Sequence, residues 1–372
     1  MRRLIPIIAV LSLALGATTP ARGQIPVPSN PRAVSPDAAN PLAGQPLFVD
    51  AVEPSWKHWR SLRKRGKKAA AARMWTIASQ PKFRWFGRFT HNVTKTVHAY
   101  TARARRQGTV PLMTSMRHHG SECGRGYTGG GRAEDARSRR WYRKFARAIG
   151  RRRVVIAFEP DSLGTIECLA RHRRQARYDL LRYGVERLAK LPNATVYIEA
   201  GASDWQSPKR MASKLRRVGV AKVRGFMLNV THYDWTASNV RYGTALSRRL
   251  GGKHFIVNTA SNGRGAVYYR RLSGGRNRRV TVWCHPLYRG LGLAPTTQTV
   301  TPLADAYLWI SRPGYSSGAC NGGPPLAGRW WPERAFSLVR WATDWVRPPR
   351  GTRFGHPRGA LTLRQVAGDQ LP

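Results

Sequence analysis

Short apolar runs alternate with longer amphipathic stretches along most of this 372-residue chain. Each short run suits a strand that is buried on both faces, and each longer stretch suits a helix that packs on a parallel sheet. Repeated β-α units predict an α/β fold, and seven or eight units in one domain favour a closed (β/α) barrel. The expected strands are Leu47–Val49, Val110–Met113, Val154–Phe158, Val196–Ile198, Phe226–Leu228, Phe255–Val257, Val280–Trp283 and Ala306–Ile310.

Two helices between these strands are predicted with clear apolar stripes. Ser138–Ile149 places Trp141 and Phe145 on the same face, and we interpret Trp141 as a core residue. The second helix, about Arg174–Leu191, has apolar residues at helical spacing from Tyr178 onward. Both stripes predict helices that cover the outside of the sheet.

The chain divides into four predicted segments. Residues 1–23 have the basic start, short apolar stretch and small residues of a secretory signal peptide, so the protein is expected to be secreted. Residues 24–45 are Pro-rich, residues 46–346 hold the barrel, and residues 347–372 form a basic Pro- and Gly-rich tail. No later run reaches the length of a membrane span. We expect a monomer.

The net charge is extreme, at +47 from 65 Lys+Arg against 18 Asp+Glu. A nucleic-acid or anionic-surface partner is therefore one hypothesis. The basic residues are spread along the whole chain, however, and no helix-turn-helix, finger or RNP pattern accompanies them. We favour a solvated cationic surface over nucleic-acid binding.

Four cysteines in an exported chain favour two disulfides. We pair Cys123 with Cys168 and Cys284 with Cys320, because each pair lies next to motifs at strand ends. No C-x-x-C pair occurs, so a zinc site is not indicated. No metal or organic cofactor is expected.

Asp161 follows the apolar strand Val154–Phe158, in the order Glu159-Pro160-Asp161. In α/β barrels the chemistry lies just past the carboxyl ends of the strands. A partly desolvated carboxyl group there has a raised pKa and suits a general acid. Alternatively, Asp161 caps the helix that follows. The residues that follow the other strands help to decide between a general acid and a helix cap.

Carboxylates, amides and indoles recur after these other strands. Glu199 to Trp205, Asn229 to Trp235 and Trp283 to His285 each follow an apolar run. Flat indole faces beside hydrogen-bonding groups suit a sugar ring, which has apolar faces and a polar rim. Alternatively, the 13 tryptophans fill a large core. For Trp205, Trp235 and Trp283 we favour the binding surface.

Ordered motifs make the chain resemble the glycoside hydrolase family 6 cellulases, the cellobiohydrolases and endoglucanases, from about Asn40 to Trp345. The resemblance implies a distorted seven-stranded α/β barrel that cuts β-1,4-glucosidic bonds with inversion. The motifs are Asn40-Pro-Leu-Ala-Gly44, Ile77-Ala-Ser-Gln-Pro81, Trp85-Phe-Gly87, Glu159-Pro-Asp-Ser-Leu163, Leu180-Leu-Arg-Tyr183, Gly252-Lys-His-Phe255, Trp283-Cys284, Arg289-Gly-Leu-Gly292, Asp305-Ala-Tyr-Leu-Trp309 and Cys320-Asn-Gly-Gly-Pro324.

The resemblance also implies roles for individual residues. Asp161 matches the general acid, and Glu122 replaces the family aspartate that supports this acid and the attacking water. Glu199 replaces an aspartate in an Asp-Ala-Gly loop. The family has two disulfides, which agrees with our pairing. The implied substrate contacts are Trp85, Glu199, Trp205, Asn229, His232, Trp283 and Arg312.

Departures from the family pattern affect the catalytic base. Ser311, Tyr315 and Ser317 stand where the family has a lysine, a glutamate and the aspartate often proposed as base, and Met116 stands at a tyrosine. Inverting hydrolysis needs a base, or a water chain to one, across about 6.5–9.5 Å. Our candidate is Glu122, acting through a water.

Three functional hypotheses follow. The first is a secreted β-1,4-glucanase, endo-acting because the segment between Gly314 and Cys320 is too short to roof a tunnel. The second is a catalytically impaired barrel that binds glycans. The third is a binder of anionic polymers, driven by charge.

Overall fold

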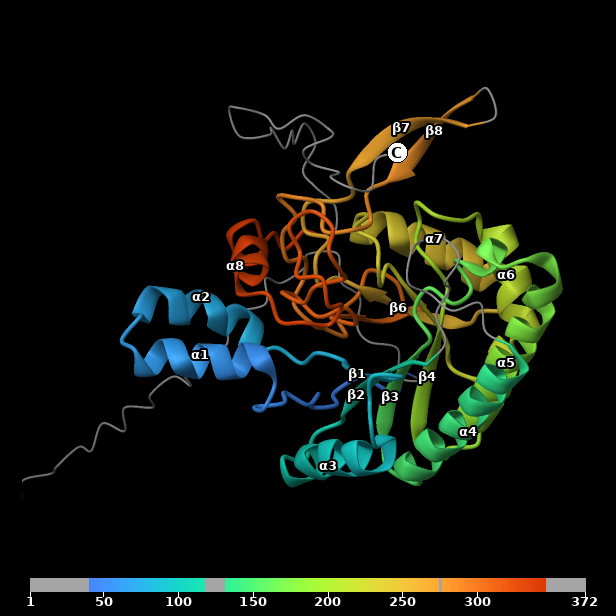
Figure 1. The fold of residues 1–372 in the computed structure, drawn as a ribbon, viewed down its shortest axis with the longest axis horizontal. Coiled ribbons are helices and arrows are strands. Elements are labelled where there is room, and N and C mark those ends of the chain that lie inside the picture. The colour runs from blue at the N-terminus through green and yellow to red at the C-terminus, as the bar shows by residue number, and fades with distance from the viewer. Residues whose placement is uncertain (1–39, 118–130, 274–275, 346–372) are drawn as a thin grey trace, which may run out of the picture.

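The structure is a computed structural model that describes residues 40–117, 131–273 and 276–345. Seven parallel strands form one curled sheet in the order β1-β2-β3-β4-β5-β6-β9 (Figure 1). Phe83, just before β1, donates a backbone hydrogen bond to Trp309, just after β9, over 3.2 Å. This contact brings the two edges of the sheet together and confirms the predicted distorted barrel. The strands are β1 (Arg84–Gly87), β2 (Leu112–Met116), β3 (Val154–Phe158), β4 (Ala194–Glu199), β5 (Gly225–Leu228), β6 (His254–Asn258) and β9 (Ala304–Leu308).

The helices α3 to α7 cover the outside of this sheet in chain order (Figure 1). The stripe expected around Phe145 is confirmed, although its helix begins six residues earlier than predicted. These helices are α3 (Val93–Arg106), α4 (Arg132–Ile149), α5 (Arg171–Ala189), α6 (Pro208–Arg217) and α7 (Thr236–Arg249), with short 3-10 turns at Ile166–Cys168 and Val220–Lys222.

Strand β3 shows how both faces of the sheet are buried. Val154, Ile156 and Phe158 belong to the core between the sheet and the outer helices. Val155 and Ala157 point the other way, into a second core inside the barrel. Because all five residues are apolar, the strand can be covered on both sides. Its end therefore leads directly into a buried environment.

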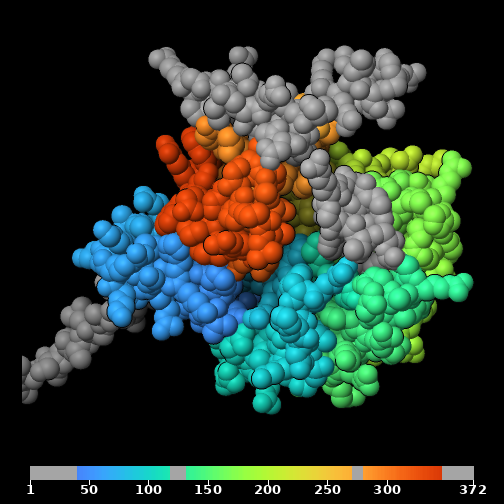
Figure 2. Space-filling model, viewed as in Figure 1, coloured from blue at the N-terminus to red at the C-terminus, as the bar shows by residue number. Residues whose placement is uncertain are grey.

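A third apolar cluster lies beside the barrel. The helices α1 (Pro54–Lys64), α2 (Lys68–Ala78) and α8 (Pro332–Arg340) pack around Trp309, which is fully buried. The α1–α2 pair forms a lobe at one side of the molecule, next to the C-terminal part of the described chain (Figure 2). No helix within the described ranges is both long and apolar enough to cross a bilayer.

Several strand predictions are wrong in detail. Leu47–Val49 is not a strand, since Leu47 makes one isolated bridge to Val110. Val280–Trp283 is not a barrel strand, because β8 (Arg276–Thr281) pairs antiparallel with β7 (Tyr268–Ser273) in a separate hairpin. Strand β1 was not predicted, because it has only four residues and begins with arginine.

Candidate active site

Asp161 lies in a tight turn directly after β3. Both Glu159 and Asp161 have left-handed backbone conformations, with φ of 54° and 67°. Such φ values are uncommon for residues other than glycine and cluster at functional sites. The turn is held by the Asp161 carbonyl, which accepts hydrogen bonds from the backbone N and the Oγ1 of Thr165 over 2.9 Å and 2.7 Å.

The Asp161 carboxylate does not cap a helix. The 3-10 turn that follows begins after Thr165 and α5 begins after Ala170, and neither has a side-chain cap. Instead, Asp161 Oδ1 accepts a hydrogen bond from Thr231 Oγ1, after β5, over 2.6 Å. The capping interpretation is therefore wrong.

Burial raises the pKa of the Asp161 carboxyl above its ordinary value. The hydrogen bond from Thr231 and the positive charge of His232 offset part of this rise. A carboxylic acid that keeps its proton to higher pH can donate it to a leaving group. The side chain is nevertheless only partly buried, so a substrate can reach it.

Glu199 lies beneath the turn that carries Asp161, at the end of β4. Its carboxylate accepts three backbone hydrogen bonds, from Leu163, Gly164 and Gly201, over 2.8, 3.1 and 2.5 Å. Burial first, and then the negative charge of Asp161, raise the pKa of Glu199 to about 7. The structure thus places Glu199 as a buried support for the turn.

His232 is held between an acid and an indole. Its Nδ1 lies 2.9 Å from Asp204 Oδ1, and its ring stacks on Trp205 at 4.8 Å between centroids. Thr281 donates a hydrogen bond to the other Asp204 oxygen over 2.7 Å. Burial lowers the pKa of His232, but the bond to Asp204 and the nearby charges of Asp161 and Glu199 outweigh it, so the pKa is raised.

The indole of Trp205 also packs against the Asp161 turn. A Cβ added at Gly164 would lie 2.2 Å from the Trp205 ring, so only glycine fits there. The predicted substrate contacts Trp205 and His232 therefore form one stacked unit beside Asp161. Asp204, which orients His232, was not singled out from the sequence, although it directly precedes Trp205.

Asn229 and Trp283 have contrasting surroundings. Asn229 is fully buried, and its side-chain nitrogen donates to the carbonyls of Asp234 and Asn258, each over 3.1 Å. The second bond joins the loop after β5 to the end of β6. Trp283 is 48% exposed, which is unusual for an indole, and it directly precedes the disulfide at Cys284.

A second group of side chains surrounds Trp85 and Arg312. The indole nitrogen of Trp85 donates to the carbonyl of Ile310 over 2.8 Å. The Arg312 guanidinium lies 3.9 Å from the ring centroid of Tyr315 and 5.8 Å from that of Trp85. Tyr315 in turn donates a hydrogen bond to Glu53. A role for Glu53 was not predicted, because Glu53 lies more than 250 residues away from Tyr315 in the chain.

The disulfide Cys284–Cys320 is confirmed. Cys168 is also disulfide-bonded, and its expected partner Cys123 lies outside the described residues. Potential ligand atoms of Cys284, His285 and Cys320 lie within 4.8 Å of one another. Both sulfurs are bonded to each other, however, so no thiolate is left to bind a metal ion.

Three further predicted positions are Ser317, Ser311 and Glu122. Ser317 is exposed, and its backbone N–H donates to His285 Nε2 over 2.7 Å. Ser311 accepts a hydrogen bond from the Asn258 amide over 2.9 Å. Glu122 lies outside the described residues.

A model of the glycosyl hydrolases family 6 matches residues 42–342. The chain belongs to this family. It is 34% identical to Endoglucanase A of Cellulomonas fimi over 79% of its length, and that match spans 61% of the longer relative. It is 29% identical to Endoglucanase 1 of Streptomyces halstedii, with 91% of this chain and 98% of the relative covered.

A solved structure of the same family agrees with the barrel described above. The endoglucanase Cel6 of Mycobacterium tuberculosis, in complex with methyl-cellobiosyl-4-deoxy-4-thio-β-D-cellobioside, is 37% identical. Its TM-score is 0.71, with 81% of this chain and 99% of that chain covered. The family 6 barrel thus covers nearly all of the described residues.

Proposed function

We propose that this protein is a secreted, inverting, endo-acting β-1,4-glucanase with Asp161 as its general acid. The observation that carries the proposal is the position of Asp161 after β3, partly buried, bonded to Thr231 and with a raised pKa. The endoglucanase relatives support the substrate class. The signal-like residues 1–23 and the Cys284–Cys320 disulfide support secretion.

In the proposed reaction the Asp161 carboxyl protonates the glycosidic oxygen while a water attacks the opposite face of the sugar. Glu122 removes a proton from this water, directly or through a second water. The Glu199 carboxylate fixes the turn that aims Asp161. The exposed indole of Trp283 and the partly exposed rings of Trp85 and Trp205 offer flat surfaces for sugar rings.

The test compares the mature protein with Asp161→Ala on carboxymethyl cellulose and mixed-linkage β-glucan, with new reducing ends as the readout. We expect Asp161→Ala to lower kcat by about 10²–10⁴-fold, as for loss of a general acid. Asp179→Ala is the matched control, because Asp179 is an aspartate on the outer surface of α5. Equal loss in both variants would count against Asp161.

Two further readouts separate the finer parts of the proposal. A fast fall in viscosity per reducing end indicates internal cutting, and a slow fall indicates action from chain ends. Proton NMR of the first products reports inversion if the new end is the α-anomer. If the unaltered protein binds β-glucan but never cuts it, the chain is a glycan-binding barrel instead.

A further inference from the structure

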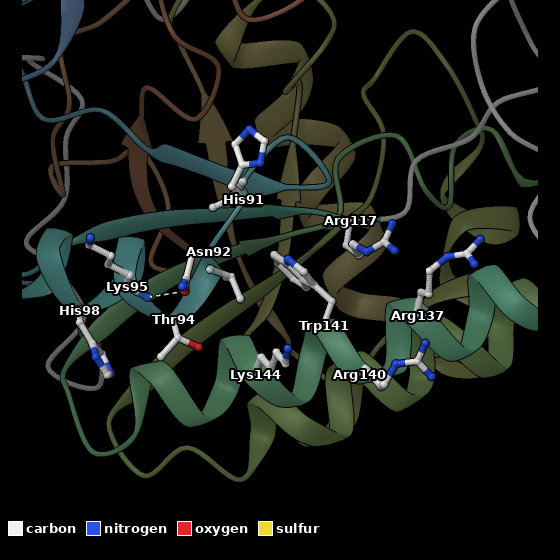
Figure 3. Close-up of a pocket in the computed structure, with 12 residues that line it drawn as sticks. His91, Asn92, Thr94, Lys95, His98, Arg117, Arg137, Arg140, Trp141 and Lys144 are labelled. Carbon is white, nitrogen blue, oxygen red and sulfur yellow. Dashed lines mark hydrogen bonds between the residues drawn. The ribbon is translucent and has the colours of Figure 1, made fainter.

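A cavity of about 730 Å³ lies between the start of α3 and the outer face of α4 (Figure 3). We call it the α3–α4 groove. Its lining contains five basic side chains, Lys95, Arg117, Arg137, Arg140 and Lys144, and none of its twelve lining residues is acidic. The volume is that of a small-molecule or oligomer site. Asp161 and its neighbours do not line it.

Two of the five cations are compensated by a single carboxylate behind the groove. Glu134 binds Arg117 over 2.7 Å and Arg137 over 2.8 Å. Burial raises the pKa of Glu134, but the hydrogen bonds from Arg137 and Arg117 outweigh it, so the pKa is lowered. Glu134 therefore stays ionised and holds both guanidinium groups in place.

The other three cations, Lys95, Arg140 and Lys144, have no acidic partner in the described part of the chain. Their side chains are exposed and come from two different helices. Like charges brought around one cavity repel one another, and a bound anion removes that repulsion. The groove thus has net positive charge that nothing in the described protein neutralises.

Trp141 supplies a second, independent feature. Its ring rises from α4 between Arg117 and the start of α3 (Figure 3). One face stacks on Phe145 at 4.9 Å, while the indole Nε1 is buried without a hydrogen-bond partner among the described residues. A buried N–H without an acceptor is costly. The ring lines the groove, so a ligand oxygen that reaches this N–H would satisfy it.

We propose that the α3–α4 groove binds a carboxylated glycan, such as a polymer of uronic acids. Each uronate offers a carboxylate for a guanidinium or ammonium group. Its hydroxyl oxygens offer acceptors for the Trp141 N–H and for Asn92 and Thr94 on the opposite wall. The groove would hold the protein on an acidic matrix while the separate catalytic edge acts on neutral glucan.

A sugar polymer fits the groove better than a nucleic acid does. Single-stranded nucleic acids bind to series of aromatic rings on which successive bases stack. The groove presents one indole, and one face of that indole already packs on Phe145. A uronic acid polymer can bind through its own hydroxyl and carboxylate groups, and such contacts do not need a free aromatic face.

Titration calorimetry of the mature protein with an oligogalacturonide, at about 0.15 M salt, tests the proposal. At this ionic strength charges beyond about 8 Å are largely screened. We expect Arg140→Gln/Lys144→Gln to weaken binding about tenfold, and Trp141→Phe about threefold. A neutral cello-oligosaccharide of equal length should not compete.

The matched control is Arg143→Gln/Arg147→Gln, which removes two exposed charges at the same four-residue spacing on α4, outside the groove. Its affinity should change by less than about twofold. Equal loss in both double variants would mean that binding follows net charge, and tighter binding of an oligonucleotide at the groove would overturn the glycan assignment. Asp161→Ala should bind the oligogalacturonide normally, which keeps this test independent of the proposed hydrolysis.

Discussion

The two sides of the candidate active site are built in different ways. On the side of β3 to β5, the carboxylates of Asp161, Glu199 and Asp204 each have a hydrogen-bond partner in the segments that follow β3 or β5. On the side of residues 311–320, the loop itself has no carboxylate, and Tyr315 instead contacts Glu53 from the start of α1. We call these the acid side and the loop side.

We infer from this difference that one side carries out the chemistry and the other binds the substrate. The acid side surrounds one carboxyl group with buried partners that set its position and its pKa, so changes there should lower kcat. The loop side combines an arginine, two aromatic rings and a distant carboxylate, which suits substrate binding, so changes there should raise KM. The comparison fails if variants of both sides affect the same kinetic constant.

Glu199→Ala should have the largest effect of the variants that leave Asp161 intact. It leaves three buried backbone N–H groups without their acceptor, which we expect to cost about 3 kcal/mol of unfolding free energy. The Asp161 turn loses its support, so kcat should fall about 100-fold. Denaturant unfolding and initial rates measure the two effects.

The control for this variant is Glu186→Ala, which removes an exposed glutamate that pairs with Lys222 on the surface. It should change stability by less than about 1 kcal/mol. Glu199→Gln keeps one acceptor oxygen, so its loss of unfolding free energy should lie between those of Glu199→Ala and Glu186→Ala. A Glu199→Ala protein with unchanged kcat would show that the turn does not depend on this carboxylate.

Thr231→Val tests how the acid side sets the pKa of Asp161. The Thr231 hydroxyl stabilises the ionised carboxylate and so lowers its pKa. Without this bond the pKa rises, Asp161 keeps its proton longer, and the alkaline limb of the pH–kcat profile should move to higher pH. A limb that stays in place would mean that another group controls it.

The sequence predicted the barrel well where strands are apolar on both faces. Val154–Phe158 was located to the residue, because five apolar residues end abruptly at Glu159. Strand β1 was missed because only two of its four residues are apolar, between an arginine and a glycine. The glycine is needed, since a Cβ at Gly87 would lie 2.3 Å from the Met116 carbonyl oxygen. Val280–Trp283 was misassigned because an antiparallel hairpin strand can have the same local composition.

The site was predictable only where its residues follow strands. Asp161, Glu199 and His232 were found this way, and the structure brings them close enough for their charges to shift one another's pKa. Glu53 could not be found, since its contact with Tyr315 depends on how the α1–α2 lobe packs beside α8. Trp141 was assigned to the core from its helical stripe, and that pattern cannot show that its ring also lines a cavity.

Tyr315→Phe tests the loop side. It removes the hydroxyl that binds Glu53 and keeps the ring that lies against Arg312. Loss of one hydrogen bond at a binding surface should raise KM about fivefold and leave kcat within about twofold. Tyr288→Phe is the control, because Tyr288 packs on Trp341. A fall in kcat with unchanged KM would place Tyr315 in the chemistry.

The smallest effect should appear in the pH dependence of stability. The pKa of His232 is raised in the folded protein above its ordinary value of 6.5, because the bond and charge of Asp204 outweigh the effect of burial. The stability that this ion pair contributes is therefore fully present below about pH 6.5 and is lost as the pH rises through the folded pKa. His232→Gln should lose about 1 kcal/mol at pH 5.5 and progressively less at higher pH.

Thermal unfolding of both proteins from pH 5 to pH 9 measures this difference. Asp204 has a lowered pKa, so its own contribution is lost only as the pH falls below its ordinary value of 3.8, outside this range. His91→Gln is the control, because His91 is exposed and forms no ion pair with the carboxylates of the described residues. If the difference in stability between wild type and His232→Gln does not shrink as the pH rises, the neutral ring stacked on Trp205 supplies the stability. The acid side would then be ordered by packing and not by charge.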